Sequence, residues 1–296
     1  MSTVSAAIDR VAVTSPLSVL RLCCAEARPC VLVIFLLRFL TGAAMSGGRP
    51  DLVTAALVWE AAVFFVYLYN GVTDVHEDRF NGSGRPIASG LLSRGAAAWI
   101  AVSAAVSALV GGLLLGGPMA AAVPVLILLG LAYSGPPCYL KRRSGGAMVT
   151  VTVAGLLTYY MGEAAAVPTP KLLVLALVMS LWMGLVGATT KDLPDAAGDA
   201  AAGRQTIAVT RGDRRVRWLA SVSAVALGVV FLVAAVVVAP ELIWPAVIML
   251  AGAAAVAVLA LGDLSQGDRS RRRRPYRAFM ITQYGVHLMA IFVSVV

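Results

Sequence analysis

Charged residues are scarce in this chain. Asp, Glu, Lys and Arg make up 13% of the 296 residues, whereas 59% are hydrophobic. A soluble domain carries about 25% charged residues, because charge covers the surface that faces water. So few charges exclude a chain surrounded by water and indicate a surface that faces lipid. Low-complexity tracts and a break in composition are also missing, so residues 1–296 are predicted to form a single transmembrane domain.

Cysteine is nearly as rare, and its placement excludes two common uses. The four cysteines are Cys23, Cys24, Cys30 and Cys138. They do not have zinc-ligand spacing, and all fall where a reducing compartment is expected, so we predict free thiols. The N-terminus also lacks a positive segment followed directly by an apolar core and a cleavage site, so no removable signal sequence is expected.

Long apolar runs dominate what is present. A bilayer core is crossed by about 20 mostly apolar residues. Nine runs have approximately this length: 30–46, 52–69, 96–115, 119–134, 147–163, 171–189, 218–239, 242–262 and 278–296. The sequence therefore predicts an all-α integral membrane protein with nine transmembrane helices. Before the first of them, Ser15 and Pro16 form a helix-start signal for a short helix on the membrane surface.

Basic residues indicate how these spans are oriented. Of the 24 Lys and Arg residues, 21 fall on one side of the nine spans, and the other three are Arg38, Arg49 and Lys171. Positive loops collect in the cytoplasm. The N-terminus is therefore predicted inside and the C-terminus outside, with cytoplasmic loops at about 70–95, 135–146 and 190–217. Because membrane lipid accounts for basic loops of this kind, the net charge of +9 predicts no nucleic-acid partner.

Acidic residues, by contrast, are concentrated. Six of the fifteen lie in two clusters that follow the second and sixth predicted spans: Asp74, Glu77 and Asp78, and Asp192, Asp195 and Asp199. Asn70 precedes the first cluster at a spacing of i, i+4, i+8, and the second cluster has the spacing i, i+3, i+7. Residues at these spacings share one face of a helix.

Such stacked carboxylates point to a bound cation. Like charges at neighbouring helical positions repel each other. Magnesium prefers oxygen ligands and is commonly held by one or two carboxylates together with substrate phosphates. We therefore predict that the two clusters hold Mg²⁺ ions and a diphosphate between them: Asn70, Asp74 and Asp78 for one ion, and Asp192, Asp195 and Asp199 for another.

These motifs resemble the UbiA-type superfamily of intramembrane prenyltransferases. The first, Asn70 to Asp78, resembles NDxxDxxxD, and the second, Asp192 to Asp199, matches DxxDxxxD. "RPIASG" (85–90), "YSGPPCYLKRR" (133–143) and "GRQTIAV" (203–209) are similar to the loops that accompany them in that family. One residue departs from the pattern: Gly71 stands where the family usually has Asp, which removes one carboxylate from the first ion's expected ligands.

The resemblance implies a helical bundle around a central cavity and an enzyme. It would use Mg²⁺ to transfer the prenyl group of an isoprenyl diphosphate to an aromatic or other lipophilic acceptor, in the inner cell membrane with the active site on the cytoplasmic side. The expected catalytic residues are Asp74, Asp78, Asp192, Asp195 and Asp199, with Asp195 or Asp199 taking the final proton. The expected diphosphate ligands are Arg85, Lys141, Arg142, Tyr133 and Tyr139.

Two other functions fit parts of the sequence. A membrane terpene cyclase would ionise the same diphosphate and let the chain's own double bonds attack the cation. A transporter would use intramembrane acids for ion coupling, but would carry them at mid-membrane on broken helices. Glu60 is the deep acid here, at the same expected depth as Arg38. Because a lone charge at that depth costs roughly several kcal/mol, we predict that these two residues pair.

Overall fold

The computed structural model describes residues 15–163 and 168–295. Over these residues the chain is helical and contains no strand, which confirms the all-α class. The short helix predicted after Ser15 is α1 (Pro16–Glu26), and the Ser15 side chain accepts a hydrogen bond from the Ser18 backbone N–H at 3.2 Å. The expected absence of a signal sequence concerns residues that lie mostly outside the described ranges.

Seven of the described helical segments are long and apolar enough to cross a membrane. They contain α3 (Leu52–Thr73), α5 (Arg94–Leu115), α6 (Gly117–Ser134), α8 (Pro170–Leu181) continuing through η2 (Trp182–Gly187) and α9 (Ala188–Asp192), α12 (Asp213–Val237), α13 (Ile243–Leu261) and α15 (Arg274–Val295). Two predicted spans fall on α2 (Pro29–Met45), which is apolar but has 17 residues, and on α7 (Ser144–Gly162). Length and composition thus support seven of the nine predicted spans.

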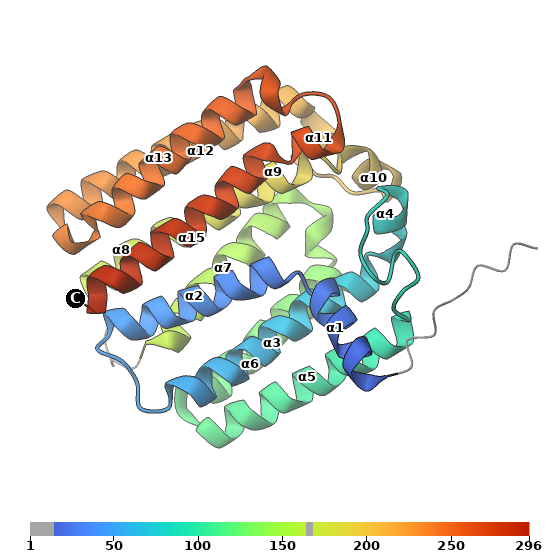
Figure 1. Cartoon of the computed structure of the whole chain (residues 1–296), viewed down its shortest axis with the longest axis horizontal. Coiled ribbons are helices and arrows are strands. Elements are labelled where there is room, and N and C mark those ends of the chain that lie inside the picture. Colours follow the sequence, from blue (N-terminus) through green and yellow to red (C-terminus); the bar gives the residue numbers. More distant parts are fainter. Residues whose placement is uncertain (1–14, 164–167, 296) are drawn as a thin grey trace, which may run out of the picture.

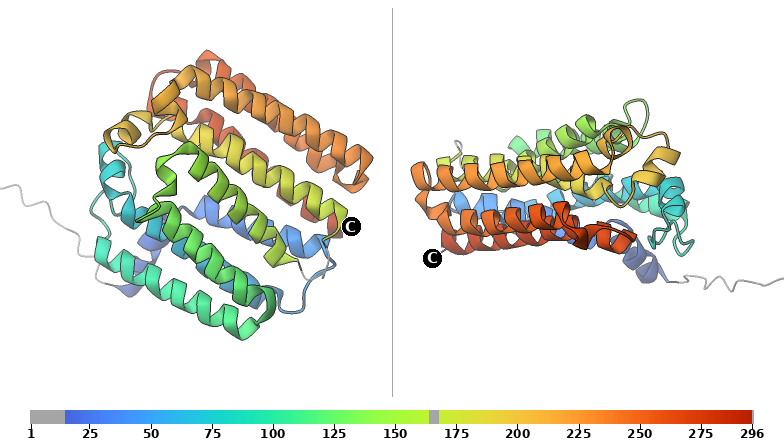
Figure 2. Two further views of the ribbon diagram at one scale, coloured as in Figure 1. Left: turned by 180° about the vertical axis from the view of Figure 1, so that it is seen from behind. Right: turned by 90° about the horizontal axis from the view of Figure 1, so that it is seen from above.

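The long helices lie side by side, and the short ones gather at one end of them. Figure 1 shows α4 (Val75–Phe80), α10 (Ala196–Ala201) and α11 (Ile207–Arg211) at the end opposite to the C-terminus. The view from above in Figure 2 shows the same separation. The two acidic motifs belong to these short helices and the segments that lead into them, so the fold brings both motifs to one end of the bundle.

Close packing of α2 on α7 forms the middle of the bundle. A Cβ atom on Gly42 of α2 would clash with the backbone oxygen of Tyr159, and one on Gly162 of α7 would clash with the backbone oxygen of Phe39. Small residues let helix backbones approach each other in this way within membranes. Helix α2 also packs against α3 and α15, so it contacts both sides of the bundle.

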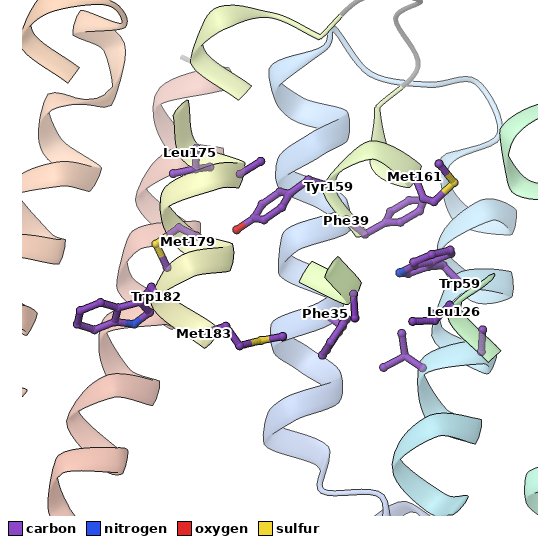
Figure 3. Close-up of a cluster of buried hydrophobic side chains, with 14 of the residues drawn as sticks. Phe35, Phe39, Trp59, Leu126, Tyr159, Met161, Leu175, Met179, Trp182 and Met183 are labelled. Carbon is purple, nitrogen blue, oxygen red and sulfur yellow. The ribbon is translucent and has the colours of Figure 1, made fainter. Parts of the chain in front are cut away.

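Large side chains fill the space around this contact. In Figure 3, Phe39 of α2 lies beside Met161 of α7 and near Trp59 of α3, Tyr159 lies toward α8, and the Met183 side chain of η2 extends toward α2. Trp59 is fully buried and donates a hydrogen bond from Nε1 to Thr158 Oγ1 at 3.2 Å. A core of this kind keeps the helix ends, and therefore the motifs, at fixed positions.

The predicted pairing of Arg38 with Glu60 is wrong. Both residues are described, and no ion pair joins them. The fully buried Arg38 instead donates hydrogen bonds to Gln283 Oε1 of α15 and, at 2.7 Å, to Met183 Sδ of η2. The buried Oε1 of Glu60 has no hydrogen-bond partner. Arg38 faces α15 and η2 because α2 lies between them and α3.

Candidate active site

The first acidic motif lies where α3 ends. Asn70 is in the last turn of α3, and Asp74 occupies the break before α4 with φ −89° and ψ 8°. Two backbone hydrogen bonds span the break, from Asp74 N to Asn70 O (2.9 Å) and from Asp78 N to Asp74 O (2.8 Å). The helical path therefore almost continues, as the i, i+4, i+8 spacing predicts, and Asp74 becomes buried.

The second motif follows an irregular helix. After α8, the segment η2 is a π-helix, a form that occurs mostly as single turns at functional sites. Helix α9 then ends at Asp192, and α10 begins after Asp195. Pro194 lies in this break, which agrees with the expectation that proline interrupts a helix interior. The break separates Asp192 from Asp199, and both side chains are buried.

Both motifs line one polar cavity. The residues that line it are Asn70, Asp74, Glu77 and Asp78 from the first motif, Asp192, Asp195 and Asp199 from the second, and Arg28, Asn81, Tyr133, Lys141, Lys191 and Arg204 from other segments. Every acid and the amide predicted to bind metal is therefore at this cavity. The two motifs are separated by more than a hundred residues in the sequence, and both contribute to this cavity. The clustering of acidic residues in the sequence suggested that the motifs would meet.

Basic residues neutralise much of the acidic lining. Lys141 Nζ lies 2.6 Å from Asp74 Oδ1, and Arg204 Nη2 lies 2.7 Å from the same oxygen. Arg204 also reaches Glu77 at 3.3 Å and, through Nη1, Asp199 at 3.3 Å. Arg204 thus joins the two motifs. The loops that carry Lys141 and Arg204 are held together by a backbone hydrogen bond of 2.7 Å between residues 205 and 142.

Burial and these cations shift the pKa values of the carboxyl groups in different directions. Burial alone would raise the pKa of Asp74, but Lys141 and Arg204 outweigh it, so that pKa is lowered. Burial also raises the pKa of Asp199, and here Arg204 opposes the rise without cancelling it. Burial lowers the pKa of Lys141, against the opposing effect of Asp74. Asp74 is therefore firmly ionised at neutral pH.

An apolar cavity continues from the polar one. The two share Arg28, Asn70, Tyr133 and Lys191. The apolar cavity has a volume of about 1000 Å³, including space at its mouth. Its lining extends from Arg28, just before α2, to Phe35 in α2 and from Tyr276 to Gln283 in α15, a separation of seven residues in each case. At a rise of 1.5 Å per residue, the cavity is about 10 Å deep.

Three of the residues predicted to hold diphosphate are not in the lining of the polar cavity. Arg85 is paired with Asp78 at 2.7 Å and with Glu26 at 2.8 Å. Arg142 is exposed, and its guanidinium lies over the Tyr139 ring at 4.1 Å from the centroid. The other two predicted ligands, Lys141 and Tyr133, do line the cavity.

The sequence did not single out Arg28 as a site residue. Arg28 precedes α2 with φ 60° and ψ 78°, in the left-handed region that few non-glycine residues adopt. It lines both cavities, and within the described residues its side chain has no hydrogen bond or ion pair. Nearby Tyr276, Asp78 and Asp74 raise its pKa despite the opposing effect of burial. Its signal in the sequence was weak, because it lies 42 residues before the first motif.

The carboxylate and amide oxygens of the polar cavity suit a hard divalent cation whose remaining ligands are phosphate oxygens and waters. Among the described residues, no three His, Cys, Asp or Glu side chains are grouped closely enough to hold a metal by themselves. Magnesium does not require this, since it is usually bound by one or two carboxylates together with phosphate oxygens and waters. Asp199 Oδ2 is buried without a hydrogen-bond partner, which leaves an oxygen donor available.

Sequence comparisons relate this chain to known proteins. A sequence model of the UbiA prenyltransferase family matches residues 32–283. The diterpene cyclase eriG of Hericium erinaceus is 33% identical over 162 residues, and coumarin 8-geranyltransferase 1 of Citrus limon is 30% identical over 166. Each match covers 51% of this chain, and the chain spans only 49% and 40% of those two proteins.

Solved structures show the same fold. A UbiA homologue from Archaeoglobus fulgidus bound to GPP and Mg²⁺ is 17% identical, covers 93% of this chain and 100% of its own, and superposes with a TM-score of 0.68. A digeranylgeranylglyceryl phosphate synthase is 16% identical, covers 94% of this chain and 99% of its own, and has a TM-score of 0.64.

Proposed function

Because the chain belongs to the UbiA prenyltransferase family, we propose that it is a magnesium-dependent enzyme that transfers the prenyl group of an isoprenyl diphosphate to an aromatic or other lipophilic acceptor. One observation supports this most directly: carboxylates of both motifs line a polar cavity that shares four residues with an apolar cavity. A molecule with an anionic head and a hydrocarbon tail suits such a pair of cavities.

The diphosphate head would lie among the basic residues of the polar cavity. Lys141 and Arg204 already neutralise Asp74, so they set the local charge before the substrate arrives. Arg28 and Lys191 lie where the two cavities meet. They are therefore placed to bind the oxygens nearest the prenyl carbon. Cations fixed in advance stabilise the leaving diphosphate more in the transition state than in the ground state, because its charge grows as the bond breaks.

The acidic residues would hold magnesium. Asn70, Asp74 and Asp78 are proposed for one ion, and Asp192, Asp195 and Asp199 for another. Bound Mg²⁺ supplies charge neutralisation for the departing diphosphate. Several of these carboxylates now form ion pairs with Lys or Arg side chains of the chain. When a metal–diphosphate complex binds, the carboxylates would bind the metal and the Lys and Arg side chains would bind the diphosphate, so that no carboxylate is left unpaired.

The apolar cavity would guide the prenyl group once the allylic C–O bond has broken with both electrons going to the diphosphate. Its walls exclude water, which would otherwise capture the cation. Tyr276 and Phe279 line it, and their rings are stacked at a centroid distance of 5.5 Å. Aromatic faces attract cations. The acceptor carbon then bonds to the allylic carbon and loses a proton, for which Asp195 or Asp199 is the proposed base.

We also propose that α2 and α7 cross the bilayer, which gives nine spans with the N-terminus and the active site in the cytoplasm. The packing of α2 on α7 through Gly42 and Gly162 supports this, because a helix in the middle of a bundle of spans has no aqueous face. The end of the bundle that carries both motifs also carries most basic loops, as expected of a cytoplasmic face in the inner membrane.

A second candidate function is cyclisation without an acceptor. The relative eriG is named a diterpene cyclase, and the same pair of cavities suits ionisation for either outcome. A transporter is less well supported, since six acids lie at the helix ends and not at mid-bundle.

Product analysis separates these functions. The full chain in lipid nanodiscs would be incubated with Mg²⁺ and C10, C15 or C20 diphosphate, with and without aromatic acceptors or a lipid extract. Transfer predicts diphosphate release that depends on the acceptor and a product with the summed mass. Cyclisation predicts release and cyclic hydrocarbon without acceptor. No diphosphate release under any condition would contradict both.

A further inference from the structure

The end of α1 reaches into a space that α3 leaves open. A Cβ atom on Gly71 would overlap Glu26 Oε1, and would lie 2.6 Å from Arg85 Nη2 and 2.9 Å from Glu26 Cγ. Glycine destabilises the interior of a helix more than any other residue except proline. Its presence in α3 therefore has a packing reason: the Glu26 carboxylate and the Arg85 guanidinium occupy the place of a side chain at position 71.

Neither of these groups is free to move aside. Glu26 is fully buried, and its Oε2 accepts a hydrogen bond from the Ile87 backbone N–H at 2.9 Å. Its Oε1 forms an ion pair with Arg85 Nε at 2.8 Å. Arg85 donates further hydrogen bonds from Nη1 to Asp78 Oδ2 at 2.7 Å and from Nη2 to the Glu26 carbonyl at 2.8 Å. A buried carboxylate with these partners is costly to displace.

This network fixes the position of Arg28. Only one residue separates Glu26 from Arg28, and the chain turns there from α1 into α2 through the left-handed conformation of Arg28. On the other side of the turn, Tyr284 Oη donates to the Cys30 carbonyl at 2.6 Å. The turn is thus held from both sides, and it places an unpaired cation at the junction of the two cavities.

We propose that Glu26 is a positioning residue of this site. It fills the space that Gly71 leaves, keeps Arg85 against Asp78, and holds Arg28 where that side chain binds diphosphate oxygens. Glu26 thus occupies, from α1, the space beside α3 in which position 71 has no side chain. The role of Arg28 rests on the proposed function, whereas the contact between Glu26 and Gly71 does not.

A double-mutant cycle tests the network. Glu26→Gln and Gly71→Ala would be made singly and together in the full chain, with Glu241→Gln and Gly95→Ala as controls. Glu241 is exposed, and a Cβ on Gly95 meets nothing within 4 Å. The readouts are the midpoint of thermal unfolding and the Kd for geranyl diphosphate with Mg²⁺.

Each single variant is expected to raise the Kd by about tenfold, the effect of losing one charged hydrogen bond. The double variant is expected to match a single one, because residues in one network are not additive. Additive effects on Kd and on unfolding, or single variants that behave like the controls, would overturn the proposal.

A second test moves the carboxylate from position 26 to position 71, and it looks for recovered binding where the first test looks for weakened binding. Gly71→Asp places a second carboxylate against that of Glu26, so this variant is expected to unfold at a lower temperature than Gly71→Ala. The pair Glu26→Ala with Gly71→Asp, which keeps the charge but moves it to α3, is expected to bind geranyl diphosphate more tightly than either change alone. Weaker binding than both would reject the positioning role.

These outcomes are distinguishable from failure of the proposed function. If the wild-type chain binds and converts diphosphates while the cycle is additive, the inference fails alone. If it binds no diphosphate while the unfolding cycle is coupled, the proposed function and the role of Arg28 fail together, and the contact of Glu26 with Gly71 stands.

Discussion

The two acidic motifs share a spacing but not an electrostatic environment. In the first, Asp74 contacts both Lys141 and Arg204, and Asp78 contacts Arg85. In the second, Asp195 contacts the half-exposed Arg269 at 2.6 Å and Asp199 shares Arg204 at 3.3 Å. Within the described residues Asp192 has no ion pair.

The chain therefore pairs the carboxylates of the first motif with its own cations and leaves those of the second less fully paired. Because a cation binds most favourably where carboxylates are least compensated, the second motif is expected to contribute more to metal affinity. The first motif, wrapped by Lys141, Arg204 and Arg85, is expected to contribute more to diphosphate positioning.

Removing one carboxylate from each motif is expected to have the largest effect. Asp74→Ala and Asp195→Ala should each reduce product formation by at least about a hundredfold, because each removes a pre-placed charge from the reacting diphosphate complex. The rate would be measured with saturating Mg²⁺, and Asp263→Ala, at an exposed acid, is the matched control. Full activity in both variants would remove the assignment of these motifs to catalysis.

Arg204→Met tests the connection between the motifs. It removes a buried cation from three carboxylates, and is expected to lower the free energy of unfolding by about 3 kcal/mol. Added Mg²⁺ should recover part of the loss, since it would replace the missing positive charge.

Arg269→Met is the comparison for the second motif. Its ion pair with Asp195 is partly exposed, so about 1 kcal/mol or less is expected. Both would be measured by thermal unfolding with and without Mg²⁺. Equal losses in the two variants would contradict the difference between the motifs.

Arg38 extends the comparison to a buried cation that hydrogen-bonds neutral side chains and forms no ion pair within the described residues. Arg38→Met should lower stability by about 2 kcal/mol, because it leaves the buried oxygen of Gln283 without its donor. Exchanging the charges of Arg38 and Glu60 should not restore the yield of folded protein. Recovery by that exchange would show that the two residues do pair.

The smallest effect is expected at Arg142. It is exposed and contacts the Tyr139 ring, whereas its neighbour Lys141 is buried against Asp74. Arg142→Ala should change the KM for the prenyl diphosphate by less than about threefold, as for other exposed charges. Lys141→Ala, measured in parallel, should raise it far more, and similar values for the two would contradict the geometry.

The sequence was sufficient for features that depend on local periodicity. Helical spacing predicted that Asn70, Asp74 and Asp78 lie along one helical path, and Pro194 predicted the break in the second motif. The apolar runs predicted an all-helical membrane protein, although α2, with 17 residues, is shorter than expected of a span and α7, with 19, is less apolar.

Long-range contacts could not be predicted in this way. Equal depth suggested that Arg38 and Glu60 pair, but helical rise gives only the position along an axis and not the direction in which a side chain points. The same limit applies to Arg85, which was predicted to face the substrate and instead lies between Asp78 and Glu26. Arg28 was likewise not singled out, because it lies far from the first motif in the sequence and reaches the cavities through the turn between α1 and α2.

The depth of the apolar cavity limits the tail that it can enclose. An extended C5 unit advances roughly 5 Å along four carbon–carbon bonds of about 1.5 Å each. About two such units fit along the roughly 10 Å of helix between Tyr276 and Gln283, or between Arg28 and Phe35. A third would meet Met183 and Gln283, which hydrogen-bond the Arg38 guanidinium, or would bend outward into the acyl chains of the bilayer. Ten carbons thus fill the enclosed space without approaching that buried charge.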